Sequence, residues 1–236
     1  MGILRTTLAV TGYSTLAATA SFYAITRHCK ILPVSPSDYL LNHTLYARYN
    51  PNNAPVTQDV CVRKVPLKKI KAELLEEGAE GKLVEAFCAG VWGGLGYAYQ
   101  RRYLDKKYRG PETATQLWDR KALKIDTYPV GTQITDHFEV VAKNSNSIIV
   151  RCGDSPRKPD VRESDGLFEM VVDVKKDEGV VEFGLKSVFY NGLAVPENVV
   201  NGRGVGKEPM SPWIQWLHAQ YDKVLMETAL RGSVMR

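Results

Sequence analysis

The chain has 236 residues, of which 44% are hydrophobic and 24% are charged, as in an ordinary globular protein. This composition excludes a disordered, a collagen-like or a multispan membrane chain. The formal net charge of +5 comes largely from residues 1–30 and 101–109, and it is too small to indicate a nucleic-acid partner. The four cysteines form no CxxC pair, so we expect neither a metal site nor a dense disulfide framework.

The first notable segment lies between Arg5 and Arg27 and carries no charge. At about 1.5 Å per helical residue it is long enough to cross a hydrocarbon core of roughly 30 Å, so we predict a membrane-anchored chain with a single hydrophobic helix within residues 1–30. Two alternatives stay open: the Ser/Thr content is typical of a mitochondrial presequence, and Ala18-Thr19-Ala20 matches a secretory cleavage site. In a lumenal chain, the sequon at Asn42 would accept a glycan.

A cluster of turn-forming residues, NPNNAPV, ends at Val56. It indicates that residues 31–56 are a linker and that the folded domain occupies residues 57–236. The alternating pattern of residues 60–65 predicts a strand, and the spacing of apolar residues over 67–78 predicts a short helix. Residues 81–108 then predict two helices joined by a glycine-rich bend.

From about Lys121 the period of the apolar residues changes from 3.6 to 2, which predicts an antiparallel meander. One face of this sheet is expected to be buried and the other polar. Ser211 and Pro212 then begin a long amphipathic helix, which we expect to end near residue 231 and to cover the sheet. The expected strands are 122–128, 132–142, 147–152, 167–174 and 180–190.

A strand, two helices, an antiparallel meander and a long C-terminal helix follow the element order of the helix-grip fold. Residues 57–231 therefore resemble the START and polyketide-cyclase-like superfamily. The resemblance implies an α+β domain in which a curved sheet wraps around the last helix and leaves an apolar cavity between them. It also implies a ligand of lipid, polyketide or terpenoid type.

Three polar residues are the candidate catalytic groups. Asp136 shares a strand face with apolar residues, so its carboxylate is expected on the cavity side as a general acid or base with a raised pKa unless it is paired. Arg151 interrupts an apolar strand and would clamp a carboxylate or polarise a carbonyl. His218 lies at the edge of the last helix and would be the only imidazole near a substrate, because His137 is expected to face solvent.

Each candidate also has a structural role open to it. Asp136 would be partly solvated at the start of its strand, Arg151 would pair with an acid on the outer face, and His218 would be a half-exposed residue on a helix edge. In the same way, the Gly-rich loop over residues 201–208 fails the spacing of a phosphate-binding loop and is better interpreted as a flexible flap.

No GxSxG, HExxH or dinucleotide-binding motif is present, so we expect no cofactor. The chain resembles in type the auxiliary cyclases of fungal natural-product pathways, which implies a cofactor-free cyclase or isomerase of secondary metabolism acting on a small hydrophobic substrate. A non-catalytic lipid or metabolite carrier is the alternative, and polar groups inside the cavity would favour the catalyst. The residues expected to contact the ligand are Trp92, Tyr97, Tyr99, Phe138, Met170, Phe183, Trp213, Leu217 and Tyr221.

Overall fold

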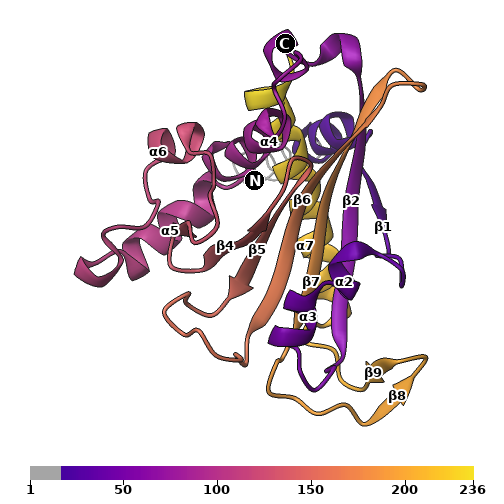
Figure 1. Cartoon of the computed structure of the whole chain (residues 1–236), viewed down its shortest axis with the longest axis vertical. Helices are drawn as coiled ribbons and strands as arrows, with labels where there is room; N and C mark the ends of the chain where they lie inside the picture. The colour runs from indigo at the N-terminus through magenta and orange to yellow at the C-terminus, as the bar shows by residue number, and fades with distance from the viewer. Residues whose placement is uncertain (1–16) are drawn as a thin grey trace, which may run out of the picture.

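The computed structural model describes residues 17–236 and is built around a seven-stranded antiparallel sheet with the strand order β1-β2-β7-β6-β5-β4-β3 (Figure 1). Strands β3 to β7 follow one another along the chain and across the sheet, which confirms the expected meander. The strands are β1 (Lys30–Leu32), β2 (Val56–Pro66), β3 (Gln133–Ile134), β4 (Phe138–Lys143), β5 (Ser147–Gly153), β6 (Asp165–Lys175) and β7 (Val180–Tyr190).

Within the described residues, helices precede β2, connect β2 to β3 and follow β9. They are α2 (Tyr39–Asn42), α3 (Thr44–Tyr49), α4 (Lys82–Gly93), α5 (Ala98–Tyr108), α6 (Arg120–Ile125) and α7 (Pro212–Ala229), which continues into a π-helical turn, η4 (Leu230–Val234). Residues 17–26 are also helical. Short 3-10 turns are η1 (Leu67–Lys69), η2 (Ala72–Leu74) and η3 (Pro111–Thr113), and a small hairpin is formed by β8 (Asn198–Val200) and β9 (Arg203–Val205).

The main core lies between one face of the sheet and the helices α4 and α7. Alternate residues of β6 and β7 point into it, as the period-2 pattern predicts, and the rings of Phe87 on α4 and Phe183 on β7 lie 5.1 Å apart. Figure 1 shows α7 running behind the strands, so the last helix covers the sheet as expected. A Cβ at Gly90 would lie 2.6 Å from the backbone oxygen of Ala229, so this glycine is needed for α4 to approach the end of α7.

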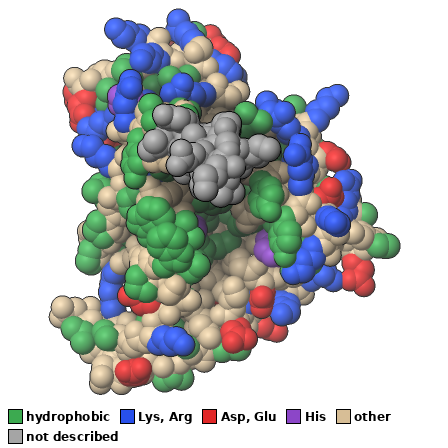
Figure 2. Space-filling model, turned by 180° about the vertical axis from the view of Figure 1, so that it is seen from behind, with side chains coloured by type: hydrophobic (Ala, Val, Ile, Leu, Met, Phe, Trp, Pro, Cys, Tyr) green, Lys and Arg blue, Asp and Glu red, His purple; other side chains and the backbone are tan. Residues whose placement is uncertain are grey.

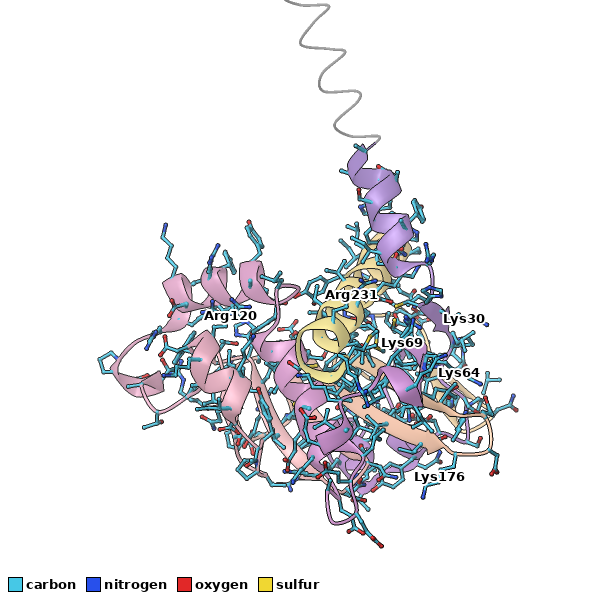
Figure 3. All side chains as sticks on the ribbon, turned by 90° about the horizontal axis from the view of Figure 1, so that it is seen from above. Lys30, Lys64, Lys69, Arg120, Lys176 and Arg231 are labelled. Atoms are coloured by element: carbon cyan, nitrogen blue, oxygen red, sulfur yellow. The ribbon has the colours of Figure 1, made fainter. Side chains whose placement is uncertain are left out.

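A buried glutamate fixes the C-terminal part of α7 to the strands. Glu227 is 1% exposed and accepts hydrogen bonds from the guanidinium groups of Arg63 on β2, at 2.9 Å, and Arg231, at 3.2 Å. Figure 3 shows Arg231 and Lys69 at this end of the molecule, with Lys30 on the neighbouring edge strand. These contacts set the rotation of α7 and hence the direction in which its preceding turns face the sheet.

Residues 31–56 differ from the expected linker. They contribute β1, which pairs with β2, and the helices α2 and α3, which cover the outer face of the sheet. Leu40 is fully buried there, and Tyr49 packs in the same cluster as Val188 and Tyr190 of the sheet. The burial of these apolar side chains stabilises the packing of residues 31–56 on the sheet. The outer face is therefore partly covered rather than uniformly polar.

Two predicted elements have a different secondary structure. Residues 122–128 were expected as a strand, but 120–125 form α6, in which Leu123 is fully buried and Ile125 is 74% exposed. The apolar residues in this short segment fit both the helical period of 3.6 and the strand period of 2, and the packing of Leu123 against α4 favours the helix. Residues 67–78, expected as one helix, form the two 3-10 turns η1 and η2.

The membrane prediction is corrected by the structure. Among residues 17–236, no helix combines the length and the apolar character needed to cross a membrane. The described end of the predicted anchor, residues 17–26, is a short helix with mostly exposed side chains, including the polar Thr19, so the expected single membrane-spanning helix and the localisation drawn from it are wrong on this finding. The first part of the predicted segment lies outside the described residues.

Candidate functional site

A cavity of about 410 Å³ lies between the sheet and the helices α4, α5 and α7. Figure 2 shows the corresponding face of the molecule, which is hollowed between groups of hydrophobic side chains. Among the described residues, the lining contains two aspartates and two histidines but no lysine or arginine. The lining residues are Trp92, Tyr97, Gln100, His137, Phe138, Cys152, Gly153, Asp154, Ser164, Phe168, Phe189, Met210, His218, Tyr221, Asp222 and Leu225.

Aromatic rings form most of one wall. The ring of Trp92 lies 4.6 Å from that of Phe138, 5.1 Å from that of Tyr97 and 6.0 Å from that of Phe168, measured between centroids. Across the cavity, the Tyr221 hydroxyl donates a hydrogen bond of 3.0 Å to the Gln100 side chain and so connects α7 with α5. A wall of packed rings with few polar atoms is suited to a flat, apolar ligand.

Three titratable groups meet where α7 packs on β2, beside the cavity. His218 and Asp222 are one helical turn apart on α7, and both face Asp59 on β2. The His218 Nδ1 atom lies 3.4 Å from a carboxylate oxygen of Asp222 and 3.8 Å from one of Asp59. Asp222 is fully buried and Asp59 is 5% exposed, whereas His218 lies partly open to the cavity.

The surroundings shift the proton affinities of this acidic cluster, which we define as Asp59, His218 and Asp222. Burial raises the pKa of Asp222 to about 8, and the neighbouring Asp59 adds to this effect while His218 opposes it. Burial lowers the pKa of His218, but the neighbouring carboxylates of Asp59 and Asp222 outweigh burial and raise it. The cluster therefore holds protons near neutral pH, where an isolated aspartate would have lost its own.

His137 lines the cavity, although the alternating pattern places it toward solvent. The reason is the turn between β3 and β4, in which Thr135 and Asp136 both have positive φ angles, of 50° and 54°. This turn interrupts the strand, so the alternation of faces does not carry through it. Burial lowers the pKa of His137, which favours its neutral form.

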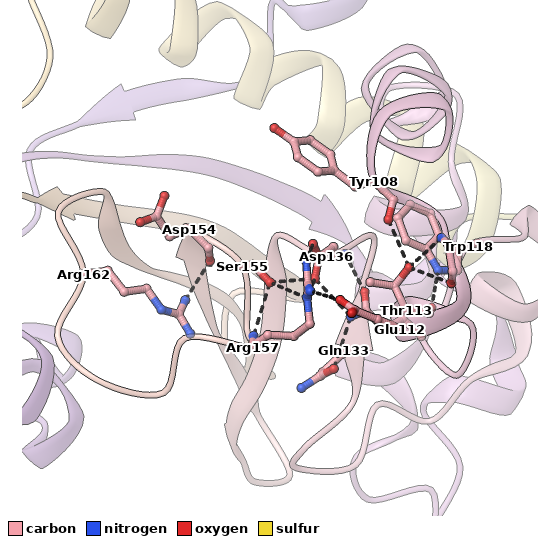
Figure 4. A network of polar contacts seen from close by, with 12 residues as sticks. Tyr108, Glu112, Thr113, Trp118, Gln133, Asp136, Asp154, Ser155, Arg157 and Arg162 are labelled. Atoms are coloured by element: carbon pink, nitrogen blue, oxygen red, sulfur yellow. Dashed lines mark hydrogen bonds and ion pairs between the residues drawn. The ribbon is translucent and has the colours of Figure 1, made fainter.

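Asp136 belongs to a separate polar network outside the cavity lining (Figure 4). Its carboxylate is buried and accepts hydrogen bonds from Gln116 at 3.2 Å, from Ser155 at 2.7 Å and from Arg157 at 3.1 Å. Arg157 also pairs with Glu112 at 2.5 Å. Burial acts to raise the pKa of Asp136, but these bonds outweigh it and lower the pKa. Asp136 therefore joins three loops and does not face the ligand space.

Arg151 lies on the outer face of the sheet, in the structural role that the sequence left open. Its guanidinium donates hydrogen bonds of 2.9 and 2.6 Å to the buried carboxylate of Asp165 and stacks 3.8 Å from the centre of the Tyr49 ring. Of the three candidate catalytic residues, the structure places only His218 at the cavity, so it does not bring the three together.

The residues expected to contact the ligand divide into three groups. Those that line the cavity are Trp92, Tyr97, Phe138 and Tyr221. Those that are fully buried in the adjoining core are Met170 and Phe183, and those that are substantially exposed to solvent are Tyr99, Trp213 and Leu217. The side chain of Asn42 is exposed at the end of α2, where its amide donates hydrogen bonds to the carbonyl groups of Pro36 and Asp38.

Two members of the acidic cluster, Asp59 and Asp222, are not among the residues predicted from the sequence. Asp222 follows His218 by four residues and interrupts the same apolar stripe, a spacing that puts both side chains on one helix face. That pattern is visible in the sequence. Asp59 alternates with the buried Cys61 and Val65 on β2, but only the pairing of β2 with β7 and the packing of α7 bring it to His218.

Comparisons with family models, with curated proteins and with solved structures found no match.

Proposed function

We propose that the chain binds a small, largely apolar molecule in the 410 Å³ cavity and catalyses a proton transfer on it, as an isomerase or a cyclase. The observation that carries the proposal is the acidic cluster, whose members His218 and Asp222 line an otherwise mainly apolar cavity. Buried ionisable groups cost folding free energy, so a pocket that only stores an apolar ligand gains nothing from them.

His218 is the proton-transfer group in this proposal. Its Nδ1 atom faces the two carboxylates, which leaves Nε2 to exchange a proton with the ligand. Asp59 and Asp222 hold the ring in place and stabilise its protonated form, in the way that a carboxylate assists a catalytic histidine elsewhere. In the reaction, the imidazole takes a proton from one atom of the ligand and returns a proton to another, so a double bond moves or a ring closes without net loss of electrons.

The alternative is a carrier that binds the same kind of molecule without changing it. The continuous aromatic wall around Trp92 favours binding in either case. The two functions differ in what they require of His218: a carrier needs its volume, whereas a catalyst needs its proton.

We also propose that the fold is of the helix-grip type. The order β2, α4, α5, β3 to β7 and α7 supports it, together with the position of β2 beside β7 and of α7 over the inner face of the sheet. In such a fold the space beneath the last helix is the ligand site, which agrees with the location of the cavity.

The test begins with the molecules that copurify with the full chain. They are extracted with organic solvent, identified by mass spectrometry and incubated with the wild-type chain, with His218→Gln and with Asp136→Asn as the matched polar control. The proposal expects conversion by the wild type and by Asp136→Asn, and a loss by a factor of about 10² or more in His218→Gln. If no extracted molecule is converted and all three proteins bind it equally, the chain is a carrier.

A further inference from the structure

The charges around the cavity are unequal. Its lining residues include Asp154 and Asp222, and no lysine or arginine among the described residues. Asp154 has a counter-charge, because the Lys158 ammonium lies 3.2 Å from it. Asp222 shares its counter-charge with Asp59: among residues 17–236, His218 is the only basic side chain within 4.0 Å of either carboxylate.

If both carboxylates of the acidic cluster are ionised, His218 can therefore match only one of the two negative charges, and no other positively charged side chain lies within 4.0 Å of them among residues 17–236. In the free chain a proton on Asp222 neutralises the other charge, in a side chain that is fully buried and has no lysine or arginine within 4.0 Å among residues 17–236. A cationic group on a ligand would replace that proton and supply both the charge and the hydrogen-bond donors.

The other walls fit the same kind of group. The rings of Trp92, Tyr97, Phe138, Phe168, Phe189 and Tyr221 surround the cavity, and the electron-rich faces of aromatic rings attract cations. A carboxylate or phosphate on the ligand would instead meet two aspartates and, within residues 17–236, no positively charged arginine or lysine.

We propose that the ligand is an organic cation, namely a mainly aromatic or polycyclic molecule that carries one protonated amine, and that this amine pairs with Asp222 and Asp59. The inference rests on the proposed function in that both use the same cavity. The carboxylates then pair with the ligand's ammonium group in addition to orienting His218, whose imidazole exchanges the proton.

The test uses three probes that share one apolar body: 1-pyrenemethylamine, which is a cation at neutral pH, 1-pyrenemethanol, which is neutral, and 1-pyrenecarboxylic acid, which is an anion. Their dissociation constants for the full chain are measured by fluorescence titration in buffer with a chelator. We expect the amine to bind at least about tenfold more tightly than the alcohol, and the acid to bind more weakly than the alcohol.

Three variants locate the effect. In Asp222→Asn the advantage of the amine over the alcohol should fall to about twofold or less, while the alcohol binds as before. In Asp154→Asn, the same change at the other lining carboxylate, the advantage should remain. In His218→Gln it should increase, because the competing cation is removed. If circular dichroism shows that Asp222→Asn is unfolded, Asp59→Asn replaces it with the same expected loss.

Equal affinity of the wild type for the amine and the alcohol would overturn the inference that the ligand is a cation, but not the proposal that the cavity binds a ligand. Failure of all three probes to bind would overturn the cavity itself, and with it the proposed function. An amine advantage that survives Asp222→Asn but is lost in Asp154→Asn would overturn the assignment to the acidic cluster. Binding that appears only when zinc is added would also overturn it, because a metal ion would then neutralise the carboxylates.

Discussion

Asp222→Asn should change how the stability of the chain depends on pH. Burial raises the pKa of this carboxyl group to about 8 in the folded chain, against about 3.9 in an unfolded one. Between these two values the unfolded chain releases a proton that the folded chain keeps. The stabilising contribution is therefore complete below about pH 4 and is lost as the pH rises through 8. The raised pKa of His218 acts in the same direction.

The size of the effect follows from one proton. Relative to Asp222→Asn, the free energy of unfolding of the wild type should fall by up to about 1.4 kcal/mol per pH unit, or about 4 kcal/mol between pH 5 and pH 8. The variant keeps the shape of the side chain and has no proton to lose. It should therefore be the more stable protein at pH 8.

Urea denaturation at pH 5, 6, 7 and 8, followed by tryptophan fluorescence, measures this difference. Asp173→Asn is the matched control, because the Asp173 side chain is 64% exposed, so its substitution should leave the pH dependence of the wild type unchanged. Parallel curves for the wild type and Asp222→Asn would show that Asp222 is ionised in the folded chain, and the account of the acidic cluster would be refuted.

Substitutions at Asp136, Arg151 and Gly96 test the structural assignments. Asp136→Leu leaves the hydrogen-bond donors around Asp136 without an acceptor and should lower the free energy of unfolding by about 2 kcal/mol. Asp136→Asn should lower it less, and both variants should bind pyrenemethanol as the wild type does. A loss of pyrenemethanol binding without a loss of stability would contradict this assignment. Arg151→Met leaves Asp165 buried without its partner and should cost about 3–5 kcal/mol, again with no effect on the probe. In Gly96→Ala the new Cβ would lie 2.6 Å from Thr228 Oγ1, so α5 and α7 should move apart and the affinity for pyrenemethanol should fall. Gly110→Ala is the control: the space around Gly110 is open, so this variant should bind pyrenemethanol as the wild type does.

The order of the elements was predictable from the sequence because it depends on local patterns. The change of period near Lys121 marks the start of the sheet region, and Ser211-Pro212 marks the start of α7 to the residue. The segment 31–56 was not recognised as part of the fold. Its apolar residues are few and are separated by turn formers, and they become a core only when the outer face of the sheet is placed beside them.

The site was less predictable, for two physical reasons. Positive φ angles at Thr135 and Asp136 interrupt the strand, so the alternation that placed Asp136 inside the cavity and His137 outside does not hold through the turn. Asp59 and His218 are separated by more than 150 residues in the chain and meet only through the packing of α7 on β2. No local pattern contains that contact, although the spacing of His218 and Asp222 does indicate one half of it.

The most direct measurement of the central claim is proton exchange at a bound molecule. The molecule extracted from the purified chain is incubated with the chain in heavy water, and its mass is followed over time. The account predicts that deuterium enters carbon-bound positions with the wild type and enters much more slowly with His218→Gln. A ligand that stays bound and takes up no deuterium with the wild type would contradict it.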